Sequence, residues 1–525
     1  MAEERLDRGA VLALVAMGLA VFVVANDVTA LTVALPQIEA DFDAGVSTVQ
    51  WVINAYALVF GVLIVTGGRL ADLFGRRRLF FVGAAIFAAF SLLGGLAQDD
   101  VWLILSRAAM GIGGAIMWPA TLGMTYAILP KAKAGIAGGL IIGAAGFGNA
   151  AGPLVGGLLT DALSWRWILF VNIPIAAIAC LVTWRTVPET RGGEEERRID
   201  YLGIATLSLG LVALLVALDE AADDGWGNWR ILALLGVCIV LLAAFVLAER
   251  RAGEHALVPG DVVRNGSFRA ACLAVLCMSP TFFAVLMFLP QLMQKILDFS
   301  ALEAGAGFLP LMGTFAAVSF AAGPLYQKLG AKTVVTSGAA CLFVGMLLFS
   351  LVEADSGYLA LIPGMVVFGL GVGLFYSSVT TAGVTALDES RSSLAGGIVY
   401  MCQVAGGSIG LGLTTSIFAG VSSGRVSSDA AAQGIAASED DLEAVDGVLA
   451  GTESAQQVLA QFPVDVADRL VDIVRDAFVA GMQWGFRVDT ALALLGLVVS
   501  ALFVGGTLRL RRREGDLLDR PGGLS

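Results

Sequence analysis

The sequence is poor in charge, in histidine and in any cysteine pattern, and each shortage excludes a class of protein. Only 14% of the 525 residues are charged and 57% are hydrophobic, whereas soluble domains carry about a quarter charged residues. The single histidine, His255, leaves almost nothing for a histidine-based metal or catalytic centre. The six cysteines lie inside apolar runs, so we interpret them as buried thiols. A soluble multidomain enzyme, a disordered chain and a disulfide scaffold are excluded.

The chain has instead many long apolar segments, and its mean hydropathy is +0.83. Because one membrane span needs roughly 20 apolar residues, we predict an all-α integral membrane protein with fourteen transmembrane helices. The apolar runs are 10–34, 48–68, 79–97, 101–127, 135–160, 167–185, 202–218, 230–248, 268–293, 302–327, 332–352, 357–380, 392–419 and 486–508.

The basic residues alternate with the acidic ones between these runs. Arg76, Arg77 and Arg78 follow the second span, whereas Glu39 and Asp41 follow the first. Since basic loops stay on the cytoplasmic side, we predict that both termini are cytoplasmic. The net charge of -12 then belongs to the outer loops, above all to an acidic loop at about 420–485. Within it, helical spacing over 464–482 predicts an amphipathic helix that lies over the protein or on the membrane surface.

The chain also repeats itself weakly. Leu35-Pro36-Gln37 matches Leu289-Pro290-Gln291 at an offset of 254, and later glycine patterns match at 255 and then 258. The slow rise of the offset indicates two homologous halves. We predict an N-terminal six-helix half at 1–190, an inserted helix pair with flanking cytoplasmic loops at 191–265, and a C-terminal six-helix half at 266–525. Parallel halves around a cavity are typical of alternating access.

The two halves differ in charge at membrane depth. The aligned pairs are Asp27 with Thr281, Asp72 with Gln327, and Arg107 with Met365. A charge inside a membrane is costly and marks a functional position by default. We therefore expect the first half to carry the ion coupling, with Asp27 as the only deep carboxylate, and the second half mainly to shape the cavity.

Several motifs accompany these charges. They are Gly68-x-Leu70-Ala71-Asp72-x-x-Gly75-Arg76-Arg77, Leu105-x-Arg107-x-x-x-Gly111-x-Gly113, Gly148-x-x-x-Gly152-Pro153-x-x-Gly156-Gly157, Asp27-Val28-Thr29 with Ala34-Leu35-Pro36, and Trp165-Arg166-Trp167 with Asn172-Ile173-Pro174. Over nearly the whole chain they resemble the major facilitator superfamily, and within it the 14-span drug:proton antiporters. The resemblance implies the major facilitator fold, two six-helix halves plus two inserted central helices.

Each motif also has a physical interpretation. Asp72 can pair with Arg76 or Arg77, or with the positive N-terminus of a helix in the other half, and contacts of this kind would latch one access state. Gly68 and Gly75 would allow the tight turn. The same residues would also fit an ordinary solvated cluster of loop charges.

Asp27 and Arg107 are candidates for a proton switch. Burial favours the protonated form of an aspartate, whereas a nearby guanidinium favours the ionised form. A purely structural buried pair is the alternative. In the fifth span, Gly148, Gly152 and Gly156 form a smooth face for close helix contact, and Pro153 would bend the helix. Simple packing of small residues is the alternative interpretation and is compatible with antiport, which this motif favours by resemblance.

Polar and aromatic residues inside the spans are candidates for a substrate cavity. They are Asn26, Asn54, Tyr56, Trp118, Asn149, Phe282, Gln291, Gln294, Tyr376, Tyr400 and Gln403. An apolar cavity with a few polar groups suits hydrophobic, loosely specified ligands.

We therefore expect a monomeric exporter in the cytoplasmic membrane that exchanges protons for hydrophobic, including cationic, small molecules. No cofactor, metal, nucleic acid or enzymatic activity is expected. The alternatives are an exporter of an endogenous lipid, siderophore or antibiotic with the same fold, and a proton-coupled importer.

Overall fold

The computed structural model of the chain describes residues 7–44, 46–130, 133–190, 199–253, 256–435, 448–449 and 457–505. Within these ranges every regular element is a helix, and fourteen segments are long and apolar enough to cross a membrane. The predicted all-α fold class and number of spans are confirmed. His255, the basic residues at 191–198 and 509–513, and the acidic stretch at 439–446 lie outside the described residues.

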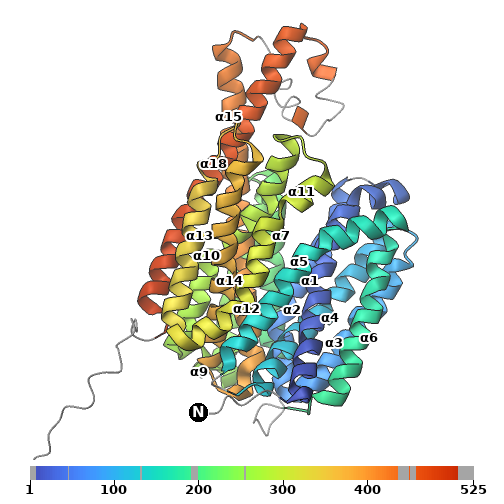
Figure 1. Cartoon of the computed structure of the whole chain (residues 1–525), viewed down its shortest axis with the longest axis vertical. Helices are drawn as coiled ribbons and strands as arrows, with labels where there is room; N and C mark the ends of the chain where they lie inside the picture. The colour runs from blue at the N-terminus through green and yellow to red at the C-terminus, as the bar shows by residue number, and fades with distance from the viewer. Residues whose placement is uncertain are drawn as a thin grey trace, which may run out of the picture.

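The first six spans form one bundle, coloured blue to cyan in Figure 1. They are α1 (Arg8–Phe42), α2 (Val46–Phe74), α3 (Arg76–Gly95), α4 (Asp100–Ile128), α5 (Ala134–Ala162) and α6 (Arg166–Thr186). In this bundle α1 packs against α5 and α6, α2 packs against α4, and α3 packs against α4 and α6.

The last six spans form a second bundle. They are α10 (Gly266–Lys295), α12 (Leu309–Leu329), α13 (Ala331–Phe349), α14 (Tyr358–Thr385), α15 (Ser392–Ala432) and α18 (Val464–Phe503). Here α10 packs against α15 and α18, α12 against α14, and α13 against α14 and α18. Each helix has the same neighbours as its counterpart in the first bundle, which confirms two six-helix halves. Short helices α9 (Gly260–Arg264), α11 (Ala301–Gly307) and η3 (Glu389–Arg391) precede α10, α12 and α15.

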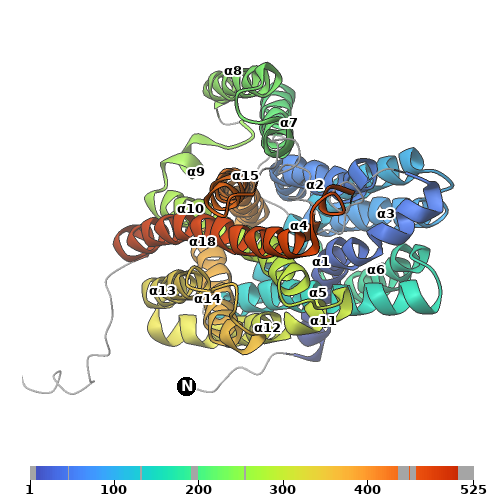
Figure 2. The same ribbon diagram turned by 90° about the horizontal axis from the view of Figure 1, so that it is seen from above.

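The inserted pair consists of α7 (Tyr201–Asp224) and α8 (Trp229–Ala252). Seen from above, both lie at the edge of the molecule, and α7 contacts α2 of one half and α15 of the other (Figure 2). On α8, Ile239 and Val240 are 69% and 67% exposed. Exposed aliphatic side chains on a span are expected where its outer surface faces lipid.

The segment 420–485 differs from its prediction. The helix α15 continues to Ala432 and α18 begins at Val464, so much of the predicted loop is helical. The predicted amphipathic helix over 464–482 is present and packs on the protein, but it is the first part of the 40-residue α18 and continues into the last span. Its apolar stripe faces α15, and the two helices project together from the bundle (Figure 1). The buried side chains between them are Val426, Ala430, Leu470, Ile473, Val474 and Ala477.

The halves touch through α5 against α12 and α14, and through α2 against α15. At Gly135 and Gly323 a Cβ on either residue would lie 2.7 Å from the carbonyl oxygen of the other. Such close backbone contact needs residues without side chains. The two bundles are thus in tight contact where α5 begins and α12 ends.

Candidate functional site

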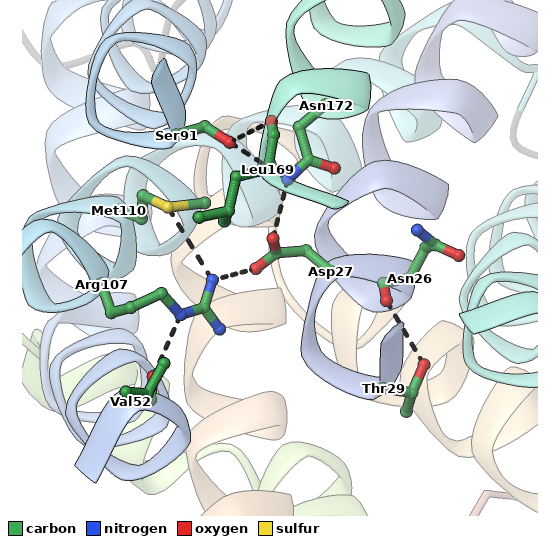
Figure 3. Close-up of polar contacts among 9 residues, drawn as sticks. All are labelled: Asn26, Asp27, Thr29, Val52, Ser91, Arg107, Met110, Leu169 and Asn172. Carbon is green, nitrogen blue, oxygen red and sulfur yellow. Dashed lines mark hydrogen bonds and ion pairs between the residues drawn. The ribbon is translucent and has the colours of Figure 1, made fainter. Parts of the chain in front are cut away.

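The centre of the first half holds a buried ion pair. The Arg107 guanidinium on α4 donates through Nη1 to Oδ2 of Asp27 on α1, and both side chains have 0% exposure (Figure 3). The two residues predicted as a proton switch are therefore in direct contact. Residues 80 positions apart meet here because α1 and α4 pack in the same bundle.

A second polar group fixes the other carboxylate oxygen. The Asn172 side chain on α6 donates to Asp27 Oδ1 at 2.7 Å and lies 3.2 Å from Ser91 Oγ on α3. The Ser91 hydroxyl in turn donates to the Leu169 carbonyl at 2.7 Å. Side chains from α4 and α6 thus hold Asp27 in one orientation, and Ser91 on α3 supports the amide. Asn172 was singled out in the sequence only as part of a family motif, and its contact with Asp27 was not predicted.

The rest of the guanidinium is also enclosed. Arg107 Nε donates to the Val52 carbonyl on α2 at 3.0 Å, and the guanidinium carbon lies 4.5 Å from the centre of the Tyr56 ring. Nη2 is buried and has no hydrogen-bond partner in the part of the chain that the structure describes. An unpaired buried donor is costly. The guanidinium is held by Asp27 and by packing, and its Nη2 group can still donate to another acceptor.

The residues predicted to form a latch lie at the junction between the halves. Asp72, near the end of α2, accepts from Arg76 Nε at 3.0 Å and from the backbone N–H of Leu394 at 2.9 Å. The Ser393 N–H points to the same carboxylate at 3.4 Å. These N–H groups belong to the first turn of α15, where backbone donors lack partners within the helix and the macrodipole is positive. Asp72 therefore joins the two halves.

Arg76 strengthens this junction, because its Nη2 donates to the Glu389 carbonyl in η3. Arg77 does not pair with Asp72: its guanidinium donates to the Trp184 carbonyl at 2.7 Å. Gly68 allows the close approach, since a Cβ there would lie 2.6 Å from the Ser393 carbonyl oxygen. Gly75 has a φ of 114° between α2 and α3, a conformation that favours glycine.

The predicted span-five motif packs on α1. A Cβ at Gly148, Gly152 or Gly156 would lie 2.8, 1.9 and 2.2 Å from atoms of Phe22, Thr29 and Ala30 respectively. The fifth helix runs unbroken through Pro153. This face therefore keeps α1, which carries Asp27, tightly against α5.

The predicted cavity residues do not gather around one cavity. Tyr56, Trp118 and Tyr400 form an aromatic cluster with Phe60 that crosses between the halves, with ring centres 5.0 to 6.1 Å apart between neighbouring rings. Phe282 and Tyr376 pack together in the second half, 5.8 Å apart. The remaining candidates are scattered: Asn26 is buried, Asn149, Gln291 and Gln403 are half-buried, and Gln294 is exposed.

A cavity of about 250 Å³ opens between α2, α7, α10 and α15. Of the predicted residues, Asn54 lines it, beside mostly apolar side chains. The inserted helix α7 contributes Leu215, Val216 and Leu218 to its wall, so one inserted helix helps to form a cavity at the junction of the halves. Substrate contact by the candidate residues stays a prediction.

The prediction that Asp27 is the only deep carboxylate is wrong. Asp489 on α18 has 0% exposure and accepts a hydrogen bond from Thr414 Oγ1 at 2.9 Å. The apolar run at 486–508 places Asp489 at the end of a span, so the sequence pattern does not mark it as deep. In the structure α18 begins 22 residues earlier, at Val464. Among the described residues, no three His, Cys, Asp or Glu side chains are close enough to hold a metal ion.

Comparison with known proteins adds to this geometry. Residues 17–411 match the description "Major Facilitator Superfamily". The chain belongs to the major facilitator superfamily. The human organic anion transporter MFSD10 superposes with a TM-score of 0.62 at 13% identity, over 94% of this chain and 99% of that one. This likeness supports the fold of the superfamily alone.

Two relatives come from Streptomyces species. The puromycin resistance protein of Streptomyces alboniger is 36% identical over 75% of this chain and 79% of its own length. The tetracenomycin C resistance and export protein of Streptomyces glaucescens is 30% identical over 93% of this chain and 90% of its own. The similarity to the second protein thus extends over nearly the whole chain.

Proposed function

We propose that this protein exports hydrophobic small molecules, including cationic ones, in exchange for protons by alternating access. The observation that carries the proposal is the Asp27–Arg107 ion pair with no exposed surface, in a chain whose relatives are named for antibiotic resistance and export. A charge pair at membrane depth is too costly to be kept without a use.

In this proposal the ion pair is one state of a proton switch. Arg107 and the Asn172 amide compensate the charge of ionised Asp27 in the conformation described. A rearrangement that separated Arg107 from Asp27 would leave an uncompensated buried charge, and uptake of a proton by the carboxylate would relieve it. Asp27 would thereby bind a proton in one access state and release it in the other.

The latch supports alternation between two states. The contacts of Asp72 with Arg76 and with the N-terminus of α15 close the end of the molecule that carries the predicted cytoplasmic loops. We propose that the protein lies in the cell membrane with both termini cytoplasmic, because basic connections favour the cytoplasmic side. We also propose that it acts as a monomer.

Uptake of ethidium into everted vesicles under an imposed pH gradient tests the function, because the cytoplasmic face of such vesicles is outside and an exporter fills their lumen. We expect Asp27→Asn to abolish proton-driven transport, because the variant keeps the size of the side chain and loses the titratable group. Asp41→Asn is the matched control on the same helix and should transport normally. Unchanged uptake in Asp27→Asn would contradict the assignment, and counterflow in oriented vesicles separates an exporter from an importer.

A second candidate is export of a single antibiotic. Two relatives are each named for resistance to one compound, puromycin or tetracenomycin C. The same vesicles separate the candidates, since a dedicated exporter would move one compound of a panel and leave ethidium untouched. Export of an endogenous lipid or siderophore also stays a prediction to be tested with that panel.

A further inference from the structure

The second half contains a buried carboxylate to which the proposed proton switch gives no role. Asp489 has 0% exposure, and its Oδ2 accepts from the Thr414 hydroxyl at 2.9 Å. Its Oδ1 is buried and has no hydrogen-bond partner among the described residues. None of the ion pairs among the described residues includes it. A single neutral donor therefore faces the carboxyl group of Asp489. In the first half, by contrast, a guanidinium and an amide contact the carboxylate of Asp27.

The position of Asp489 in the repeat is informative. The helices α6 and α18 occupy equivalent places, against α1 and α3 in one half and against α10 and α13 in the other. At an offset of 317, Trp167 aligns with Trp484, Val171 with Val488, and Asn172 with Asp489.

Burial supports this alignment along the whole of α6. Its buried residues are Ile168, Leu169, Asn172, Ala176, Ala179 and Thr183. The positions 317 further along are Gly485, Phe486, Asp489, Ala493, Gly496 and Ser500, and each of them is buried in α18. Two helices that bury the same positions present the same face to their half, so Asp489 lies at the depth at which Asn172 binds Asp27.

Both halves therefore have a buried carboxylate, but it lies on a different helix in each half. In the first half the carboxylate is on the first helix, at Asp27, and the amide is on the last, at Asn172. In the second half the first helix has Thr281, whose hydroxyl donates to the Met278 carbonyl at 2.7 Å, and the last helix has the carboxylate. The second half has the carboxylate but not a paired arginine.

The described residues around Asp489 offer no compensating charge. Its own helix carries Arg487, whose guanidinium is exposed and lies 4.9 Å from the Trp484 ring centre. Contacts of Gly496 with Met278, and of Phe486 with Phe288 and Phe349, show which parts of α10 and α13 pack beside it. The charged residues of the adjoining helices α10, α13 and α15 lie more than two turns from that level: Arg269, Lys295, Lys332, Arg425 and Asp429. An ionised carboxylate without a cation or a network of donors is expensive at this depth.

We propose that Asp489 is a second proton-binding site, located in the C-terminal half and occupied by a proton in the conformation described. This rests on the proposed proton-coupled function. The bound proton makes Asp489 a neutral carboxylic acid, with Thr414 as its hydrogen-bond partner. When the C-terminal half rearranges and water reaches the α15–α18 contact, the acid releases the proton to that water and returns to its carboxylate form. Asp27 and Asp489 are then occupied in opposite states of the cycle.

The protonation itself can be measured without transport. Infrared spectra of the full-length protein in liposomes report the C=O stretch of protonated carboxyl groups. We expect a component of this band that Asp489→Asn removes and that Asp27→Asn keeps. Thr414→Val is the packing control: it removes the donor while the acid, and its band, remain. An Asp489→Asn spectrum identical to that of the wild type in this region overturns the proposal.

Exchange of the proton during transport needs a second measurement. We expect the number of protons moved per ethidium molecule to fall in Asp489→Asn relative to the wild type. An unchanged ratio, even with the infrared band present, would make Asp489 a permanently neutral structural acid and overturn the proposal. If Asp489→Asn transports nothing, the disappearance of the band on raising the pH of the wild type decides instead, and a band that never titrates overturns it. Full activity of Asp27→Asn would refute the proposed function. That outcome differs from an unchanged proton ratio in Asp489→Asn and from a band that never titrates.

Discussion

Arg107 and Asp27 meet at the centre of the first half with neither side chain exposed, so each neutralises the other where water cannot reach. The pair joins α1 to α4, and Asn172 adds α6 through the second carboxylate oxygen. Removal of one partner from such a pair costs much more than removal of both, because the remaining charge is left buried and alone. The pair is thus both a structural link and the element best placed to respond to a proton.

Loss of the guanidinium alone should destabilise the protein strongly. We expect Arg107→Ala to lower the free energy of unfolding by about 3–5 kcal/mol at neutral pH, because it strands the Asp27 charge. The double variant Asp27→Asn, Arg107→Gln should recover much of this loss. Thermal unfolding in detergent compares the three proteins, and a double variant no more stable than Arg107→Ala would argue against an electrostatic origin.

Removal of the Asp72 charge should loosen the junction of the halves. Asp72→Asn loses the charge that faces Arg76 and the first turn of α15, so we expect a larger population with this end open. Distances between spin labels at Arg78 and Asp388, both exposed, would report the opening as a longer component.

The control for this change is Asp465→Asn, which removes an exposed carboxylate paired with Arg469 at 3.6 Å, far from the junction. Exposed pairs contribute little, so its distance distribution should equal that of the wild type. A distance distribution in Asp72→Asn equal to that of the wild type would contradict the latch role of Asp72.

A methyl group at Gly152 should separate α1 from α5. A Cβ there would lie 1.9 Å from Thr29 Oγ1 and 2.9 Å from the Ala30 backbone nitrogen, and overpacking of this kind typically costs about 1–3 kcal/mol. We expect Gly152→Ala to lower both thermal stability and ethidium efflux. Gly236→Ala on α8 is the matched control, because its Cβ would meet nothing within 4 Å. Equal behaviour of the two variants would contradict the packing role.

The ion pair of Asp41 with Arg166 should make a small, pH-dependent contribution outside the membrane. The hydrogen bond from Arg166 lowers the pKa of Asp41 below its ordinary value of 3.8, against a smaller opposing effect of burial. A lowered pKa in the folded state stabilises the protein above the unfolded value, and the gain is lost as pH falls through the folded one. Asp41→Asn should therefore be slightly less stable than the wild type at pH 7. The difference in melting temperature should disappear at a pH well below 3.8, and a constant difference would exclude linkage to Asp41.

The fold followed from the sequence to a large extent. Apolar runs of span length predicted the fourteen crossing segments, and the rising offset of the repeat predicted two equivalent halves. The segment 464–482 could not be placed in this way, because Asp465, Asp468, Arg469, Asp472 and Arg475 lower its hydropathy and separate it from the last apolar run. Only packing shows that its apolar stripe faces α15 and that one helix runs from Val464 to Phe503.

By itself, the amino-acid sequence determined that Asp27 and Arg107 lie at membrane depth, because depth follows from position in an apolar run. The tertiary structure decided what those charges touch. Residues from different helices meet in the contacts of Asp27 with Arg107 and Asn172, and in the contact of Asp72 with the α15 N-terminus. The isolation of Asp489 also depends on which helices surround it. Such contacts depend on how each helix is rotated and which helix lies next to it. Hydropathy averages over a helix and carries no record of either.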